Sequence, residues 1–165
     1  MTMKAAHGSF WETSEVVFGI PLLIGIALQL AVPLSLSPGA FRLVLIPVGA
    51  AFASIGLTFI VLARREFARY GQPTDPGRPT SKVVTTGVFS ISRNPLYLGV
   101  VGILVGIALA LNILWIIVLL VPALIACHSV LIVPEEKYLA AKFGEEYRRY
   151  TASVHRWLGR VRSTG

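Results

Sequence analysis

The residues from Leu96 to Val133 form one apolar run without Asp, Glu, Lys or Arg, in which only His128 could take a charge. A helix rises about 1.5 Å per residue, so about 20 apolar residues cross the roughly 30 Å of hydrocarbon in a bilayer. The run is about twice that length. Because backbone polar groups cannot stay unpaired in lipid, we expect a helical hairpin that turns near Asn112, with spans at 96–111 and 113–133.

Two further apolar tracts predict spans at 16–36 and 41–63. The whole chain, residues 1–165, is then expected to be a single membrane domain. Its predicted fold class is an all-α integral membrane protein with four transmembrane helices. A cytoplasmic loop would cover residues 64–95, and a C-terminal amphipathic helix and tail would cover residues 134–165.

The charge pattern indicates how the chain lies in the membrane. The sequence is 55% hydrophobic and 14% charged, which is too apolar for an ordinary soluble domain. Its net charge of +7 comes from 15 basic residues, nearly all in segments 64–93 and 137–162, so it does not indicate nucleic-acid binding. The positive-inside rule places both segments, and the N-terminus with Lys4, in the cytoplasm. Frequent Arg, Ala and Gly suggest a prokaryotic cytoplasmic membrane.

Spanning a membrane does not explain the segment from Pro73 to Arg93. Its Pro and Gly content indicates a structured loop that leads into Asn94 and Pro95 at the start of an apolar helix. The Arg93 guanidinium beside exposed backbone amides is suited to holding an anion. The alternative is that Arg93 is a positive-inside anchor and that Pro95 only begins the helix.

A second unexplained segment runs from Pro134 to Val154. Apolar and aromatic side chains recur along it at helical spacing, at positions Leu139, Phe143, Tyr147, Tyr150 and Val154. This apolar stripe predicts one helix at the membrane surface that covers something apolar. Glu135 and Glu136 lie in its first turn, where they either complement the helix dipole or face inward to bind a cation or sugar hydroxyls.

Several absent motifs narrow the chemistry. No HExxH, CxxC or His cluster occurs, so a metal site is not expected, and neither GxGxxG nor a P-loop is present. The spacing Gly99-x-x-Gly102-x-x-x-Gly106 predicts close helix packing. We interpret Cys127 and His128 as packed core residues, although an ionisable group within a membrane span is also a candidate for a functional site.

Three motifs in the second half of the chain carry a family likeness. They are Thr85-Thr86-Gly87-Val88-Phe89, then Ser92-Arg93-Asn94-Pro95-Leu96-Tyr97-Leu98-Gly99, and Glu135-Glu136 followed by Phe143-Gly144-Glu145-Glu146-Tyr147, Tyr150 and Arg156-Trp157. In this order they resemble the isoprenylcysteine carboxyl methyltransferase family, which is related to the phospholipid N-methyltransferases. That family commonly has a histidine where Asn94 stands, a proline where His155 stands, and arginines where Ser129–Val133 has none.

The resemblance implies an integral-membrane methyltransferase that uses S-adenosyl-L-methionine and a lipophilic methyl acceptor. Carried over by position, the cofactor-binding residues would be Lys82, Val83, Val84, Phe89, Arg93, Asn94, Pro95, Tyr97, Gly99, Glu135 and Glu136. Tyr147, Tyr150 and Arg156 would contact substrate. If the acceptor is an amine, the candidates for removing its proton are Glu135, Glu136 and His128.

Five functions stay open at this point. The leading one is carboxyl methylation of a lipidic or prenylated small substrate, and a phospholipid N-methyltransferase or a thiol S-methyltransferase is the alternative within the same chemistry. An NADPH-dependent sterol-type reductase is an alternative from another enzyme class. The last is a non-catalytic membrane module whose basic faces bind anionic lipid.

Overall fold

The computed structural model describes residues 14–72 and 80–161, so Lys4, most of the Pro73–Thr80 stretch and Arg162 lie outside the described residues. In the described part the chain is helical and has no β-strand, as predicted, and its only β-type contact is an isolated bridge between Val154 and Arg160. The helices are α1 Ser14–Ala31, α2 Arg42–Arg69, α3 Pro95–Leu111, α4 Leu114–Ala126, α5 Val133–Phe143 and α6 Glu145–Ser153. Two 3-10 turns, η2 Gly39–Phe41 and η3 Gly87–Ser90, and a π-helical turn, η4 Cys127–Ile132, complete the set.

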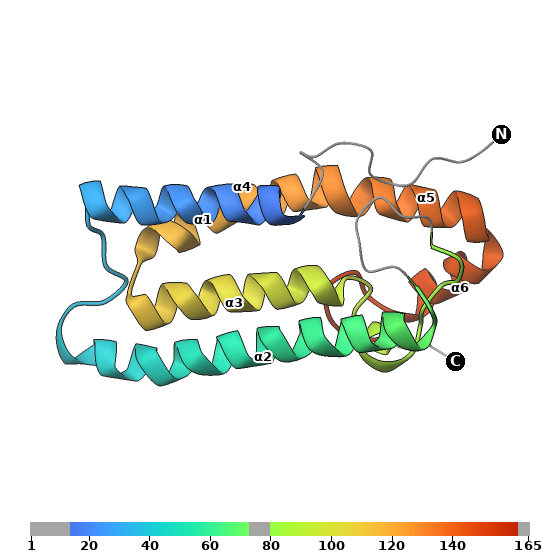
Figure 1. Cartoon of the computed structure of the whole chain (residues 1–165), viewed down its shortest axis with the longest axis horizontal. Coiled ribbons are helices and arrows are strands. Elements are labelled where there is room, and N and C mark those ends of the chain that lie inside the picture. Colours follow the sequence, from blue (N-terminus) through green and yellow to red (C-terminus); the bar gives the residue numbers. More distant parts are fainter. Residues whose placement is uncertain (1–13, 73–79, 162–165) are drawn as a thin grey trace.

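The long helices run side by side, with α2 against α3 and α1 against α4 (Figure 1). Three helical stretches are long and apolar enough to cross a membrane by length and composition: Ser14–Ala31, Gly39–Arg69 and Leu114–Phe143. Many large apolar side chains on them are exposed, such as Leu30 at 83% and Leu43 at 71%, which suits contact with lipid. The fourth predicted span, α3, is an apolar helix of 17 residues, shorter than these three.

Two helices end at residues other than those predicted from the sequence. The first helix ends at Ala31 rather than at residue 36, because Val32 precedes Pro33 and a residue before proline disfavours the helical conformation. The second helix continues beyond residue 63 to Arg69. This extension places Glu66 and Phe67 on the helix, where sequence analysis expected the loop to begin.

The predicted hairpin turn lies at Asn112. Asn112 adopts a left-handed conformation, with φ 58°, and ends α3, while α4 begins at Leu114. Its side-chain oxygen accepts from the Ser37 N–H at 3.0 Å, and its side-chain nitrogen donates to the Ser37 carbonyl at 2.8 Å. The turn is therefore tied to the connection between α1 and α2.

Glycines bring α2 and α3 into close contact, as the glycine spacing predicted. A Cβ placed on Gly56 would lie 2.5 Å from the Gly99 carbonyl oxygen, and one on Gly49 would lie 2.5 Å from the Gly106 carbonyl oxygen. Only residues without a side chain let the two backbones approach this far. The contact places the start of α3, and so the candidate site before it, beside the end of α2.

The predicted surface helix over Pro134–Val154 is wrong in its boundaries. Pro134 does not begin a new helix, because α4, the π turn and α5 form one continuous helix from Leu114 to Phe143. A proline inside an α-helix lacks a donor and crowds the preceding turn, and here the wider π turn lies directly before it. The break falls instead at Gly144, whose φ of 53° and ψ of −117° separate α5 from α6.

The apolar stripe nevertheless gathers into one cluster. Tyr147, Tyr150 and Val154 are buried, and Leu139 and Phe143 pack against them. The cluster is completed by residues from α2 and from the segment around η3: Ala63, Val84, Val88 and Phe89. The stripe thus covers the loop before α3, and Gly144 bends the chain so that both helices can reach it.

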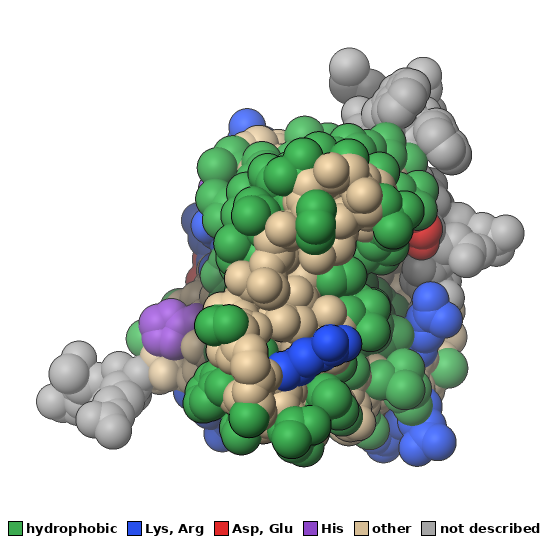
Figure 2. Space-filling view, turned by 90° about the vertical axis from the view of Figure 1, so that its left-hand side faces the viewer, with side chains coloured by type: hydrophobic (Ala, Val, Ile, Leu, Met, Phe, Trp, Pro, Cys, Tyr) green, Lys and Arg blue, Asp and Glu red, His purple; other side chains and the backbone are tan. Residues whose placement is uncertain are grey.

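Charge is concentrated at the end of the molecule that carries α6 and η3. Figure 2 looks at the opposite end, where the visible surface is mostly hydrophobic side chains and backbone with few charged groups. All ion pairs between described residues lie at the charged end, on α2, α5 and α6, on the segment before α3 and on the tail after α6. The candidate functional residues therefore lie at one end of the helices.

We expect Gly56→Ala to destabilise the protein by about 1–3 kcal/mol, because the added methyl group would overlap the α3 backbone. Gly19→Ala is the matched control, since nothing lies within 4 Å of a Cβ at that position of α1. Thermal unfolding in detergent measures both. Equal melting temperatures for the two variants would contradict the close contact of α2 with α3.

Candidate functional site

The segment between η3 and α3 is held in place by the C-terminal tail, residues 154–161. The Gly159 N–H donates to the Ile91 carbonyl at 2.7 Å, and the Arg93 N–H donates to the His155 carbonyl at 3.2 Å. The Asn94 side chain adds a bond of 3.0 Å to the backbone carbonyl of Arg156. Segments about 60 positions apart in the sequence therefore set each other's conformation, and the Arg93 side chain begins from this junction.

Glu136 lies between two arginines. The Arg93 guanidinium donates from Nη1 to Glu136 Oε1 at 2.8 Å. Arg156 donates in a two-pronged manner, from Nε to Oε1 at 3.0 Å and from Nη2 to Oε2 at 2.7 Å. The side chains of Arg93 and Glu136 are only 14% and 19% exposed, so water weakens this pair little. The hydrogen bonds from Arg156 to Glu136 raise the pKa of Arg156 above its ordinary value.

Glu135, the neighbouring carboxylate, has a different partner. The Tyr97 hydroxyl on α3 donates to Glu135 Oε2 at 3.3 Å. The two glutamates thus point to different neighbours, one to arginines and one to a phenol. Unlike Glu136, Glu135 makes no ion pair within residues 14–72 and 80–161.

Arg93 has an unused donor inside the protein. Its Nε is buried and has no hydrogen-bond partner, although Nη1 is bonded to Glu136. A buried donor without a partner is costly, commonly by about 1–3 kcal/mol. An acceptor brought by a bound ligand would remove that cost, and a carboxylate suits a guanidinium best.

Two tyrosines of α6 close one side of this cluster. Tyr150 donates from its hydroxyl to the Phe89 carbonyl at 2.7 Å, which ties α6 to η3. Burial raises the pKa of Tyr150 above its ordinary value. Burial, and secondly the Glu136 carboxylate, raise the pKa of Tyr147 to about 12, against the lowering effect of Arg93. Both phenols therefore stay neutral at physiological pH, and both hold the fold as well as lining the site.

The remaining residues predicted for the cofactor lie in different surroundings. Val83, Val84 and Phe89 pack in the apolar cluster of the stripe, with the Phe89 ring 4.8 Å from that of Phe67. Pro95 is fully buried at the first turn of α3, and Lys82 is exposed. Gly99 faces α2, where a Cβ would lie 2.6 Å from the Gly56 carbonyl oxygen, so helix packing accounts for this glycine.

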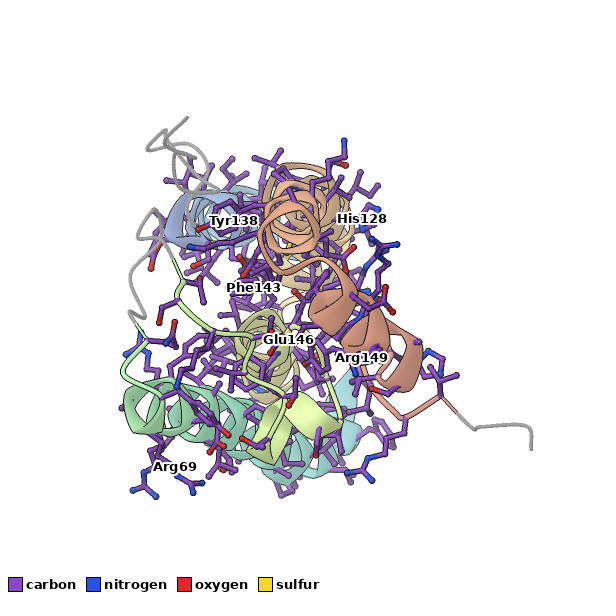
Figure 3. All side chains as sticks on the ribbon, turned by 90° about the vertical axis from the view of Figure 1, so that its right-hand side faces the viewer. Arg69, His128, Tyr138, Phe143, Glu146 and Arg149 are labelled. Atoms are coloured by element: carbon purple, nitrogen blue, oxygen red, sulfur yellow. The ribbon has the colours of Figure 1, made fainter. Side chains whose placement is uncertain are left out.

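His128 does not join the cluster of arginines and glutamates. It lies in the π turn, and Figure 3 shows it on the side of the long helix, away from Glu146 and Arg149. The Val133 N–H donates to the His128 backbone carbonyl, but the His128 side chain makes no hydrogen bond to another described residue. Across residues 14–72 and 80–161, no group of three His, Cys, Asp or Glu side chains is placed to hold a metal ion.

Sequence reasoning missed a second buried carboxylate that supports the site. Glu66 on α2 is 6% exposed, and it accepts hydrogen bonds from the Thr86 hydroxyl and from Arg69. Gly87, with φ 58°, passes close to it, because a Cβ there would lie 3.0 Å from the Glu66 carboxylate. This contact anchors the loop before Arg93. The signal for it was Phe67 following Ala63 at helical spacing, which indicates that the helix continues.

Comparisons with known proteins place most of the chain in one family. The sequence model of a family described as phospholipid methyltransferase matches residues 44–146. A Haemophilus influenzae protein described as uncharacterized is 67% identical over 24 residues, which are 14% of this chain. The chain spans 38% of the length of that relative. No solved structure matches the chain.

We expect Glu136→Gln to lower the free energy of unfolding by about 2–4 kcal/mol, because it removes the negative charge between two arginines, one of them mostly buried. Glu145→Gln is the matched control, because the Glu145–Arg148 pair is 70% and 74% exposed and contributes about 0–1 kcal/mol. Chemical unfolding in detergent gives both values. A loss no larger in Glu136→Gln than in Glu145→Gln would refute the role of this ion pair.

The raised pKa of Tyr147 predicts that the folded protein loses stability at alkaline pH. Its pKa is about 12 in the folded protein, whereas tyrosine in an unfolded chain ionises near pH 10. The contribution of the neutral phenol is complete below pH 10 and is lost as the pH rises toward 12, by up to about 2 kcal/mol. Unfolding measured at pH 9 and 11.5 should show a smaller loss for Tyr147→Phe than for wild type. The same loss in both would contradict the raised pKa.

Proposed function

The chain belongs to the phospholipid methyltransferase family, and we propose that it is a membrane methyltransferase that transfers a methyl group from S-adenosyl-L-methionine to a lipidic acceptor. The observation that carries the proposal is the meeting of Arg93, Glu135 and Glu136 at one end of the helices. Arg93 precedes α3 and the glutamates begin α5, so only the tertiary fold joins them.

The chemistry of these side chains fits the amino-acid end of the cofactor. The buried and unpartnered Nε of Arg93 offers a donor for the carboxylate. Glu135, which has a phenol as partner and no cation, offers an acceptor for the ammonium group. Glu136 would not bind the cofactor by itself. Its 2.8 Å hydrogen bond to Arg93 would instead hold the arginine in position.

When bound, the cofactor would supply an electrophilic methyl group on a sulfonium, which a lone pair of the acceptor could attack with a neutral thioether as leaving group. The protein's own work is to position the acceptor and to exclude water. Tyr147 and Tyr150, both buried, form the wall that shields this end from solvent. The nearby π turn sets the direction of the residues that follow it, including both glutamates.

The contacts of the two glutamates separate their roles if the acceptor is an amine, which must lose a proton. Glu136 accepts three hydrogen bonds from two arginines, so both of its carboxylate oxygens are already engaged. Glu135 accepts only the Tyr97 hydroxyl among the described residues, so Glu135 is the base that we propose. His128 lies in the π turn before α5, and its side chain makes no hydrogen bond to either glutamate.

Among acceptors, a phospholipid amine agrees best with the family match and with these contacts. An isoprenylcysteine carboxylate, which the sequence motifs suggested, would need a cation to bind it. Arg156 is the candidate, and its guanidinium is already engaged on Glu136. A thiolate acceptor would need neither the cation nor the base.

For the topology, we propose that α3 is a fourth span and that the basic end faces the cytoplasm, with both termini on that side. The contact of α3 with α2 over Gly99, Gly102 and Gly106 supports a shared path through the bilayer. The gathering of charge at one end supports the orientation. The membrane would be the cytoplasmic membrane of a prokaryote.

We expect purified protein in detergent to bind S-adenosyl-L-methionine, and Arg93→Lys and Glu135→Gln to weaken that binding at least about tenfold, since a charged hydrogen bond contributes about 1.5–3 kcal/mol. Lysine keeps the charge of Arg93 but has no counterpart of Nε. Arg148→Ala is the control, because Arg148 is exposed on α6 and pairs only with Glu145. Equilibrium dialysis with labelled cofactor provides the dissociation constants.

A titration with NADPH on the same samples separates the other function classes. Binding of NADPH without binding of S-adenosyl-L-methionine would indicate a reductase and end the methyltransferase proposal. If folded protein bound neither, it would be a non-catalytic membrane module. Equal affinity in all three variants would refute the assignment of the site but not that of the reaction.

A further inference from the structure

A concave site lies at the charged end, and Tyr150 is one of the residues that line it. It is an open groove of about 560 Å³ between α6, η3 and the C-terminal tail. Its polar lining includes Ser90, Glu146, Arg149 and Arg160, and Tyr150 and Val161 contribute apolar walls. In Figure 3, which looks onto this end, Glu146 and Arg149 project from α6. No residue of the ion-pair cluster of Arg93, Glu136 and Arg156 lines the groove.

Two arginines from different elements face this groove. Arg160 comes from the tail, and its Nε donates to the Ser90 carbonyl at 3.1 Å, which fixes the guanidinium at the rim. Arg149 comes from α6. Neither makes an ion pair with another described residue, whereas Arg148 next in the chain pairs with Glu145 at 3.7 Å. With Glu146 as the one carboxylate in the lining, the groove carries a net positive charge and suits an anion.

Apolar side chains lie exposed beside the groove. Ile91 is 38% exposed, Leu158 is 59% exposed and Val161 is 41% exposed. They belong to one junction, because the Gly159 N–H donates to the Ile91 carbonyl at 2.7 Å. Other exposed large apolar residues lie on the long helices or in the connection at the opposite end. A positively charged groove with an exposed apolar edge suits an amphipathic ligand with an anionic head.

The groove also lies at the level where lipid headgroups are expected. η3, which supplies Ser90, packs on α2 through Val88 and Phe89, against Ala63. Ala63 is the last residue of the apolar part of α2, before Arg64 and Arg65. Charges that directly follow an apolar span mark the boundary between hydrocarbon and headgroups.

From the groove, its charge, its apolar edge and its level, we infer that it binds the phosphate of a phospholipid headgroup. Arg149 and Arg160 bind the phosphate oxygens, and the glycerol and acyl part lies against Ile91, Leu158 and Val161. The same tail bonds to the segment that carries Arg93, so a bound lipid stabilises that segment as well. This inference does not depend on methyl transfer.

The test uses three soluble probes on the full chain in detergent: dihexanoyl phosphatidylglycerol, inorganic phosphate and dihexanoylglycerol, which lacks the phosphate. Titration calorimetry should show saturable binding of the phospholipid, with inorganic phosphate and dihexanoylglycerol each at least about tenfold weaker, because each lacks one half of the contacts. Binding of inorganic phosphate as tight as that of the phospholipid would assign the groove to a free anion and overturn the lipid inference.

Single substitutions at the groove test whether the phospholipid binds there. Arg149→Ala should weaken phospholipid binding at least about tenfold, and its neighbour Arg148→Ala should leave it unchanged. Leu158→Ser should weaken binding of the phospholipid but not that of inorganic phosphate. Because Arg160 also bonds to Ser90, it is tested as Arg160→Lys, with unfolding followed in parallel.

Equal phospholipid affinity in Arg149→Ala and Arg148→Ala would overturn the inference. Binding of S-adenosyl-L-methionine by Arg149→Ala should match wild type. This second readout separates a failure of the lipid site from a failure of the proposed function.

Discussion

Glu136 is the point at which the charged end of this protein is joined. Its carboxylate accepts hydrogen bonds from Arg93, which precedes α3, and from Arg156, which lies in the tail after α6. Three parts of the chain therefore meet on one side chain of the long helix. The charges are mostly shielded from water, so separating them leaves a buried ion without a partner. This interaction keeps the tail on the loop, while Arg93 Nε stays buried without a hydrogen-bond partner among the described residues.

Helix geometry decides where Glu136 points. The helix that begins at Leu114 runs through Pro134 without ending, and a π turn precedes the proline. A π turn holds more residues per turn than an α-helix, so it rotates everything that follows. Glu135 then faces Tyr97 and Glu136 faces the arginines. At Gly144 the chain bends and α6 turns back, which brings Tyr147 and Tyr150 over the loop.

The two sites inferred at this end use different basic residues. Arg93 and Arg156 are committed to Glu136, while Arg149 and Arg160 face the open groove. Tyr150 lines the groove, and its hydroxyl donates to the backbone carbonyl of Phe89. The fold therefore gives the basic residues of this end two different surroundings, an ion-paired cluster and an open groove.

Much of the fold follows from local properties of the sequence. The apolar runs predicted the long helices and the hairpin turn at Asn112, because length is local and lipid allows few alternatives. The glycine spacing in α3 predicted close helix packing, and the structure shows that the partner is α2. The same reasoning placed the end of the first helix too late and the start of a surface helix at Pro134. Proline gives a strong local signal, but the π turn before it depends on the packing of Leu131 and Ile132 in the core.

By itself the sequence determined that this chain is helical and apolar, that its charge lies in two segments, and that Arg93, Glu135 and Glu136 are its most distinctive polar residues. Only the tertiary structure decided that Glu136 binds Arg93 and Arg156 and that Glu135 accepts a hydrogen bond from Tyr97. It also decided that Glu66 supports the loop before Arg93. The physical reason is that these contacts join residues far apart along the chain. Which partner each side chain reaches depends on the direction in which its helix face points, and the π turn and Gly144 set that direction. Residue spacing within a single segment does not reveal this direction.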